Sequence, residues 1–347
     1  MIAEGSARSA RLPTGIGAVI MAGGIFGAAA LQRIPGAGAL LTTPLSIALA
    51  IGWAGVAASA LRDGMADHTG PLVGSFAIGT WTAASVVVAR MAMLAAPALL
   101  WPAELLFAVS LGLWAWFVPR AIGNLVRIAR SPAASTRPTG AILLTTVATQ
   151  AVALLGFRLF ADVWQMRWLG FALLAFGAGC YVVGTGLIAR RYAAGGAWRL
   201  AADWDNTNCI LHGALSISGL AAVVGEGFGI APIAWLWVLT AAVFLAVEAI
   251  EIARLGARVR VLGWRGAVIV YDTSQWARNF TFGMFYAFTV AVAGRLDVDG
   301  GYPEPARVAA AIAGGGQYLV LALLAVELAL MGCWLAGRLE RQLHPAR

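Results

Sequence analysis

The segment from Gln275 to Gly294 carries one aromatic ring beside a face of small side chains. At about 100° per residue, several positions fall within about 80° of one another. Phe280 lies at the rim of this face, which comprises Asn279, Gly283, Ala287, Val290 and Gly294. A narrow, smooth helix face with one bulky ring is suited to line a pore that the ring closes. The other interpretation of Phe280 is an aromatic side chain packed in the core of a helix bundle.

His212 and Ser216 lie one helical turn apart, the spacing of a base and a nucleophile on one helix. The other histidines, His68 and His344, lie in or near expected loops and leave His212 without partners for a metal site. The sequence has neither an HExxH motif nor a paired acidic motif. We therefore predict no catalytic residue, no metal and no cofactor. An intramembrane enzyme that acts on a lipid-soluble substrate is the alternative function.

Two acidic residues lie inside apolar segments, where placing a charged side chain in the bilayer costs free energy. Glu248 and Glu327 lie within such segments, where carboxylates are rare. We expect them to stabilise contacts between helices or subunits, and a role in moving protons stays open. The run DWDNTN at 203–208 lacks the second acidic cluster of a carboxylate metal site, and Asn206 is expected to cap the helix that follows.

The composition indicates an integral membrane protein. Of 347 residues, 61% are hydrophobic and only 12% are charged, which leaves too little polar surface for a soluble protein of this size. The 42 glycines exceed the usual share of about 7% and suit close helix contacts in a bilayer. The cysteines are far apart and predict neither disulfides nor a metal knuckle: Cys180, Cys209 and Cys333. The formal charge of +8 is expected to reflect topology and not a nucleic-acid partner.

About 20 apolar residues are needed for each crossing, and the chain divides into ten expected helices. We predict a single all-α membrane transport domain over residues 1–347, with an uncleaved first span. The expected helices are 14–32, 38–61, 72–97, 99–123, 139–159, 166–189, 209–230, 232–253, 276–295 and 308–337.

Arginines, the only basic residues besides histidine, predict the orientation. With the N-terminus inside, the inner segments hold seventeen arginines and the outer segments hold six, while Arg278 lies at the inner end of 276–295. Cytoplasmic loops carry the excess of positive charge. We therefore expect a multi-pass protein of the cell membrane with both termini in the cytoplasm.

The odd-numbered expected helices share a stripe of small and hydroxyl residues, whereas the even-numbered ones are rich in tryptophan and phenylalanine. This alternation predicts five helical hairpins, each sending one helix into an inner ring around a pore. Arg90 would lie at the outer vestibule, although snorkelling at the interface explains it equally well. Besides Asn279, Gly283 and Ala287, the predicted lining consists of Gly17, Gly24, Ser75, Gly79, Thr82, Thr145, Thr149, His212, Ser216 and Gly219.

Three segments carry a family resemblance: ATQAVALLG at 148–156, NCILHGALSISGLA at 208–221 and WARNFTFGMFYAFT at 276–289. With ten spans and both ends inside, they resemble the tellurite-resistance/dicarboxylate transporter family, which includes slow anion channels and malate and sulfite exporters. The resemblance implies a homotrimer in which each protomer has its own pore, with Phe280 as the gate. Thr281 stands where many relatives have proline. The expected partners are lipid and small anions, and the sequence does not choose among chloride, nitrate, sulfite, malate and tellurite, because such a lining selects weakly.

Overall fold

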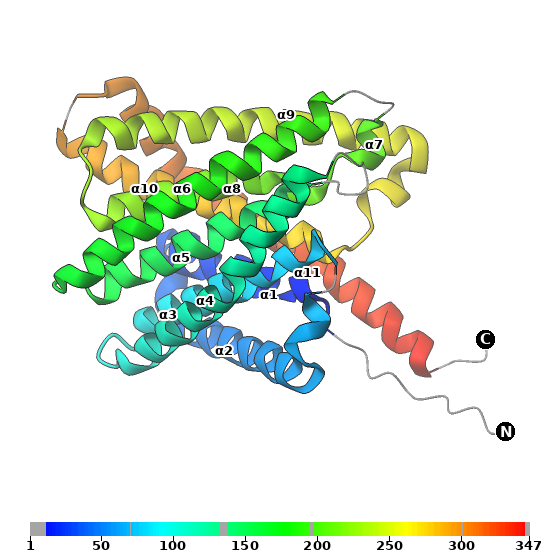
Figure 1. Cartoon of the computed structure of the whole chain (residues 1–347), viewed down its shortest axis with the longest axis horizontal. Coiled ribbons are helices and arrows are strands. Elements are labelled where there is room, and N and C mark those ends of the chain that lie inside the picture. Colours follow the sequence, from blue (N-terminus) through cyan, green and yellow to red (C-terminus); the bar gives the residue numbers. More distant parts are fainter. Residues whose placement is uncertain (1–11, 70, 132–137, 195–197, 300, 344–347) are drawn as a thin grey trace.

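The computed structural model describes residues 12–69, 71–131, 138–194, 198–299 and 301–343, and every regular element among them is helical (Figure 1). The prediction of an all-α membrane protein is confirmed in its fold class. Nine helical segments of this part of the chain are long and apolar enough to cross a bilayer: Thr14–Arg33, Ala37–Asp63 (α2), Gly74–Ala95, Trp101–Arg130 (α4), Gly140–Leu159, Trp164–Ala193 (α6), Asn206–Gly225, Ile230–Val268 (α9) and Pro303–Arg338 within α11 (Pro303–Leu343).

The remaining expected span corresponds to α10, Trp276–Asp299, which is not among these nine. Arg278 and Asn279 near its start and Arg295 near its end lower its mean hydropathy. Its side chains are nevertheless buried along its length, as the low exposures of Trp276, Phe280 and other residues show. The count of ten membrane crossings therefore stays a prediction.

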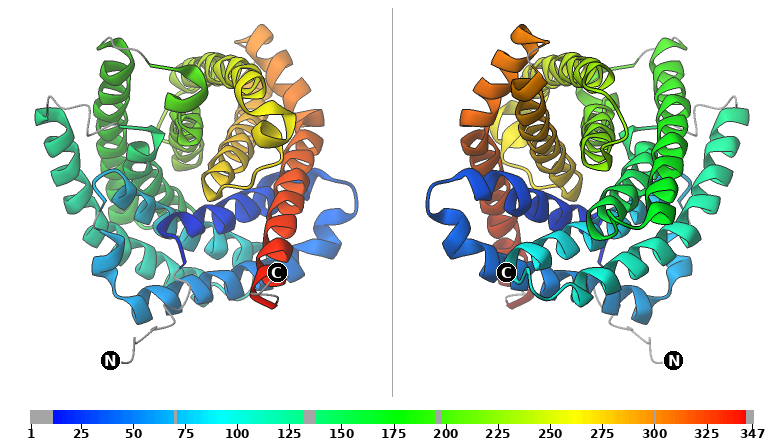
Figure 2. Two further views of the ribbon diagram at one scale, coloured as in Figure 1. Left: turned by 90° about the vertical axis from the view of Figure 1, so that its right-hand side faces the viewer. Right: turned by 90° about the vertical axis from the view of Figure 1, so that its left-hand side faces the viewer.

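Short buried helices alternate with long exposed ones along the chain. In the first, third, fifth and seventh segments, 61% to 89% of the most apolar stretch is buried, against 17% to 39% in α2, α4, α6, α9 and α11. The end-on views of Figure 2 show the long helices on the outside of the bundle. Tryptophans such as Trp101, Trp164 and Trp235 point outward from them, as suits a lipid interface.

The buried helices contact one another in a closed series. Helix α1 (Gly17–Ile25) packs on α3 (Gly79–Ala95), α3 on α5 (Leu144–Leu159), α5 on α8 (Ile210–Gly225), α8 on α10, and α10 again on α1. Glycines lie at these contacts: a Cβ atom on Gly79 would come within 2.8 Å of the Leu144 carbonyl oxygen, and one on Gly213 within 2.2 Å of the Thr281 methyl group. Small residues thus let the helix backbones approach closely.

Each of these five helices begins with a 3₁₀ turn, and the five turns also contact one another in a closed series. They are η1 (Thr14–Ile16), η5 (Gly74–Ile78), η6 (Gly140–Leu143), η7 (Asn206–Cys209) and η8 (Thr273–Gln275). The same local structure therefore recurs five times at one end of the bundle, which places the starts of all five buried helices at a common level.

The first buried segment is irregular where it passes the centre of the bundle. After α1 the chain forms a π-helical turn, Phe26–Ala30 (η2), and then a 3₁₀ turn, Leu31–Arg33 (η3). A π turn adds one residue to the helix and often marks a functional site. Its effect here is to advance the side chains that follow it by one position around the helix.

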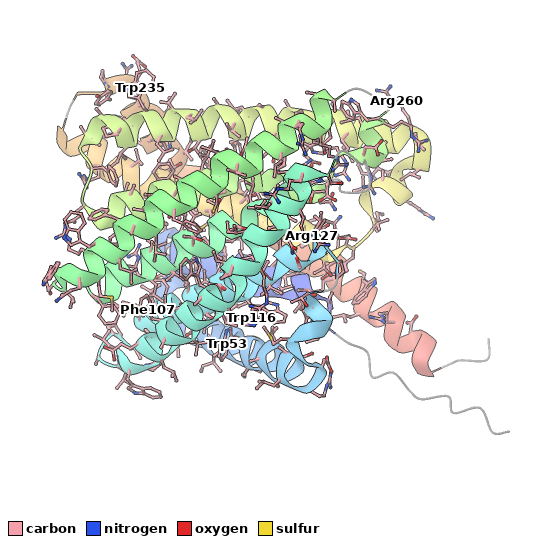
Figure 3. All side chains as sticks on the ribbon, in the orientation of Figure 1. Trp53, Phe107, Trp116, Arg127, Trp235 and Arg260 are labelled. Atoms are coloured by element: carbon pink, nitrogen blue, oxygen red, sulfur yellow. The ribbon has the colours of Figure 1, made fainter. Side chains whose placement is uncertain are left out.

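Several helices are longer than predicted. Helix α9 continues well beyond 253, and its backbone turns sharply at Gly263, which has a φ of 72°. Hydropathy detects only the apolar part of a helix, so the arginine-rich continuation of α9 was missed. Arg127 and Arg260, on α4 and α9, lie at the same end of the bundle, opposite Trp235 (Figure 3).

Candidate functional site

A cavity of about 350 Å³ lies among the five buried helical segments, and each of them contributes to its wall. Its lining is apolar except for one amide and three guanidinium groups. The residues that line it are Ile25, Ala28, Ala29, Gln32, Arg33, Ala83, Val86, Val87, Arg90, Ala151, Leu154, Leu155, Arg158, Ile217, Leu220, Phe280, Met284, Ala287, Val290 and Ala291.

Arginines gather at one end of this cavity. Arg33, Arg90 and Arg158 lie near the ends of their segments, away from the ring of 3₁₀ turns. No carboxylate lines the cavity, and within the described residues none forms an ion pair with Arg90 or Arg158. Uncompensated positive charge beside apolar walls raises the local concentration of anions.

Phe280 lies at the opposite end of the cavity. It is the cavity-lining residue of α10 nearest to the 3₁₀ turns, as Ala83 and Ala151 are on α3 and α5. Its side chain is only 2% exposed, and it is larger than the side chains that line the cavity at this level from the other helices. The cavity therefore has arginines at one end and a buried aromatic ring at the other.

The cavity brings together four residues of the predicted pore: Phe280, Ala287, Val290 and Arg90. The predicted glycines lie instead at contacts between neighbouring helices. Added Cβ atoms would meet Thr80 from Gly17, Val87 from Gly24, Leu144 from Gly79, Phe288 from Gly219 and Ile25 from Gly283. A stripe without side chains fits a helix contact as well as a pore, and the spacing alone did not separate these two possibilities.

The predicted hydroxyl and amide residues are buried, and they divide into two groups. Ser75, Thr149 and Ser216 are bonded: Asn124 donates to Ser75, the Trp114 indole donates to Thr149, and Ser216 donates to the His212 carbonyl oxygen. Side-chain oxygens of three others have no hydrogen-bond partner among the described atoms, and these residues are Thr82, Thr145 and Asn279. Each precedes the cavity-lining stretch of its own helix, toward the 3₁₀ turns.

His212 and Ser216 do not form a nucleophile and base pair in this structure. The Ser216 hydroxyl donates to the backbone carbonyl of His212 at 2.8 Å and not to the imidazole. The imidazole is fully buried and packs edge-on against Phe244. Within the described residues, no group of three His, Cys, Asp or Glu side chains is placed to hold a metal ion.

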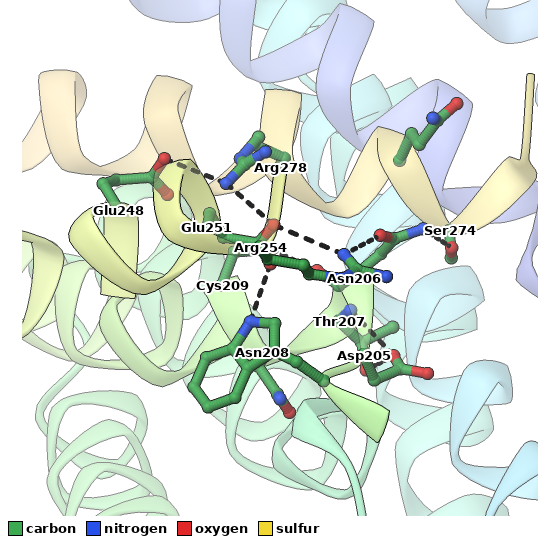
Figure 4. A network of polar contacts seen from close by, with 12 residues as sticks. Asp205, Asn206, Thr207, Asn208, Cys209, Glu248, Glu251, Arg254, Ser274 and Arg278 are labelled. Atoms are coloured by element: carbon green, nitrogen blue, oxygen red, sulfur yellow. Dashed lines mark hydrogen bonds and ion pairs between the residues drawn. The ribbon is translucent and has the colours of Figure 1, made fainter. Parts of the chain in front are cut away.

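A polar network joins the starts of α8 and α10 to α9 (Figure 4). Arg278 lies 3.0 Å from a Glu248 oxygen and 3.4 Å from Glu251, and Arg254 lies 3.3 Å from Glu251. The Trp204 indole donates to Glu251, and Arg254 donates to the Asn206 side chain at 2.6 Å. These ion pairs and hydrogen bonds link the starts of α8 and α10 to α9.

The turn before α8 is capped one residue earlier than predicted. Asp205 accepts a hydrogen bond from the backbone N–H of Thr207 at 2.8 Å and is the N-cap, whereas Asn206 bonds to Arg254 and Ser274. Aspartate and asparagine are nearly equivalent as caps, so residue type alone does not distinguish Asp205 from Asn206.

Sequence reasoning also missed Arg33 and Arg158, which it counted only for topology. A repeated spacing identifies Arg158 but not Arg33, because Gln32 takes the equivalent position in the first segment. Ala83, Val86, Val87 and Arg90 line the cavity from α3, and Ala151, Leu154, Leu155 and Arg158 line it from α5 with the same spacing. In the first segment Ile25, Ala28, Ala29 and Gln32 repeat it, and Arg33 follows by one position after the π turn.

Comparison of the sequence with models of known protein families gives no match, and comparison with curated proteins gives none either. The features of the chain that bear on function are the cavity, its three arginines and the buried ring of Phe280.

Proposed function

We propose that this chain moves small anions across the membrane, along a path between the five buried helices. The observation that carries the proposal is the cavity that these helices enclose, with three arginines at one end and no carboxylate in its wall. Guanidinium groups attract anions and repel cations. The apolar wall has no strong binding partner for an ion, so it would not trap an anion in the path.

In this proposal Phe280 is the gate. Its ring lies where the cavity ends, and an apolar constriction blocks ions by excluding water even without complete steric closure. Thr82, Thr145 and Asn279, whose side-chain oxygens lack partners, continue the path toward the 3₁₀ turns. An anion would thus pass from the arginines, past the ring, to a short polar section.

The wider arrangement is part of the same proposal. Helix α10 is the tenth crossing, the ten crossings form five hairpins, and both termini lie on the cytoplasmic side of the cell membrane. The resemblance to the tellurite-resistance/dicarboxylate transporter family adds a homotrimer with one path in each protomer. Mass measurement of the detergent-solubilised protein, corrected for bound detergent, tests the trimer.

Flux from liposomes tests the proposed function. Purified protein is reconstituted, and chloride, nitrate, sulfite and malate are compared with potassium, using protein-free liposomes as the control. We expect passage of at least one anion well above that of potassium. If no anion passes, and the protein instead converts an added lipid or soluble substrate, the function is that of an intramembrane enzyme.

A further inference from the structure

The buried imidazole of His212 has no described function in the path, and its polar atoms are unusually placed. The residue is fully buried, and neither ring nitrogen has a hydrogen-bond partner among the described atoms. Its Nε2 atom lies 3.8 Å from Oε1 of Glu248, which also lacks a hydrogen-bond partner there. Two unpartnered polar atoms thus face each other at slightly more than hydrogen-bonding distance, in a buried site where unmade hydrogen bonds are costly.

The charges around this pair balance before any proton is added. Glu248 on α9 and Arg278 on α10 face the imidazole, and Glu251 and Arg254 on α9 complete the network. The thiol of Cys209, at the start of α8, is the other titratable group beside the network. Two carboxylates and two guanidinium groups cancel, so one proton on the imidazole gives the cluster a net charge of +1.

We propose that His212 and Glu248 form a proton-binding site, in which a proton on Nε2 of His212 is held by Oε1 of Glu248. Closing the gap of 3.8 Å by about 1 Å would make a charge-assisted hydrogen bond, which is stronger than a bond between neutral groups. The other oxygen of Glu248 accepts a hydrogen bond from Arg278, so the carboxylate is already held in position when the proton binds.

The site lies beside the helix turn that carries Phe280. Gly213, next to His212, packs directly on the side chain of Thr281, so that α8 and α10 lie close together at this point. Phe282, the residue after Thr281, packs edge-on toward the imidazole with ring centroids 6.3 Å apart. This part of the inference rests on the proposed function: a positive charge here favours an anion in the path, and an anion there favours the proton.

Nuclear magnetic resonance tests the proton site without reference to transport. The chain has three histidines, so replacing His68 and His344 by glutamine leaves His212 as the sole source of imidazole signals. We expect its ring signals to change as the pH falls from about 8 to about 5, and Glu248→Gln to displace that change. Ring signals that stay constant throughout, or a titration unaffected by Glu248→Gln, would overturn the proton site.

Flux measurements then test its connection to the path. Anion flux should rise at least about threefold from pH 8 to pH 5 in the unaltered protein, and His212→Gln should remove this dependence. Glu327→Gln, which alters a buried carboxylate elsewhere, on α11, is the matched control and should leave it in place. If the imidazole titrates but His212→Gln retains the pH dependence, the link to the path is refuted. If no anion flux occurs at any pH, the proposed function fails and the proton site stands on the resonance result.

Discussion

The arginines at the end of the cavity are the residues on which anion selectivity would depend. Arg90 and Arg158 occupy equivalent positions in the repeat that α3 and α5 share, and neither has a carboxylate partner within the described chain. Their charges are therefore available to an anion that enters the cavity. A salt bridge would have cancelled most of this attraction.

Replacing Arg158 by glutamine should lower anion flux by about 3–10-fold at low ionic strength, because the field at the cavity entrance weakens. The effect should shrink as salt is added. Arg167→Gln is the matched control, since Arg167 is exposed near the same end of the bundle but does not line the cavity. An equal loss of flux in both variants would show that surface charge, and not the cavity, is responsible.

The polar network around Glu251 should contribute more to stability than an exposed ion pair does. Glu251→Gln removes the charge that pairs with Arg254 and Arg278, and should lower the free energy of unfolding by about 2–4 kcal/mol, somewhat less than for a fully buried pair because Arg278 is partly exposed. Glu304→Gln breaks an exposed pair with Arg307 and should cost about 0–1 kcal/mol. Thermal unfolding in detergent compares the two variants, and equal losses would contradict the structural role of the network.

At the scale of elements, sequence spacing predicted the helices well and the roles of their faces less well. Hydropathy predicted where the helices lie. Phe280 lines the cavity together with Ala287, which lies about two turns further along the same face of α10. The glycine stripes were assigned to the lining, yet they lie at contacts between helices, because close helix approach and an open path both call for small residues. The π turn before Arg33 left no signal in the sequence.

This distinction between faces predicts opposite outcomes for two tryptophan variants. Ala287→Trp places an indole in the cavity and should block flux while the protein still assembles. Gly79→Trp should reduce assembly instead, since even a Cβ atom there would approach a backbone carbonyl at 2.8 Å. Ala329→Trp, on the exposed face of α11, should affect neither property. Size-exclusion profiles and flux per assembled protein separate the cases, and an unblocked Ala287→Trp variant would place the path elsewhere.

At the scale of the whole molecule, the structure is a bundle in which a buried set of five helices is enclosed by longer, more exposed ones. A 3₁₀ turn precedes each of the five buried helices, and the starts of these helices lie at the same level at one end of the bundle. Arginine-rich ends of α4 and α9 lie at one end of the bundle, whereas Arg33, Arg90 and Arg158 belong to the opposite ends of the buried helices.

Cysteine labelling in intact cells tests the orientation. With Cys333 replaced by serine, only buried native cysteines remain. A cysteine in place of Val261, which is 73% exposed on the arginine-rich continuation of α9, should resist an impermeant reagent, and one in place of Asp162 should react. The reverse pattern would invert the proposed topology.

A comparison of two truncations on α10 tests whether Phe280 closes the path for anions. Phe280 ends the cavity, whereas Phe288 is equally buried but packs on Gly219 of α8. Each change to alanine should cost about 3–5 kcal/mol of stability, so anion conductance is measured per assembled protein in liposomes. Phe280→Ala should conduct more than both the unaltered protein and Phe288→Ala. A Phe280→Ala variant no leakier than Phe288→Ala would show that Phe280 does not close the path.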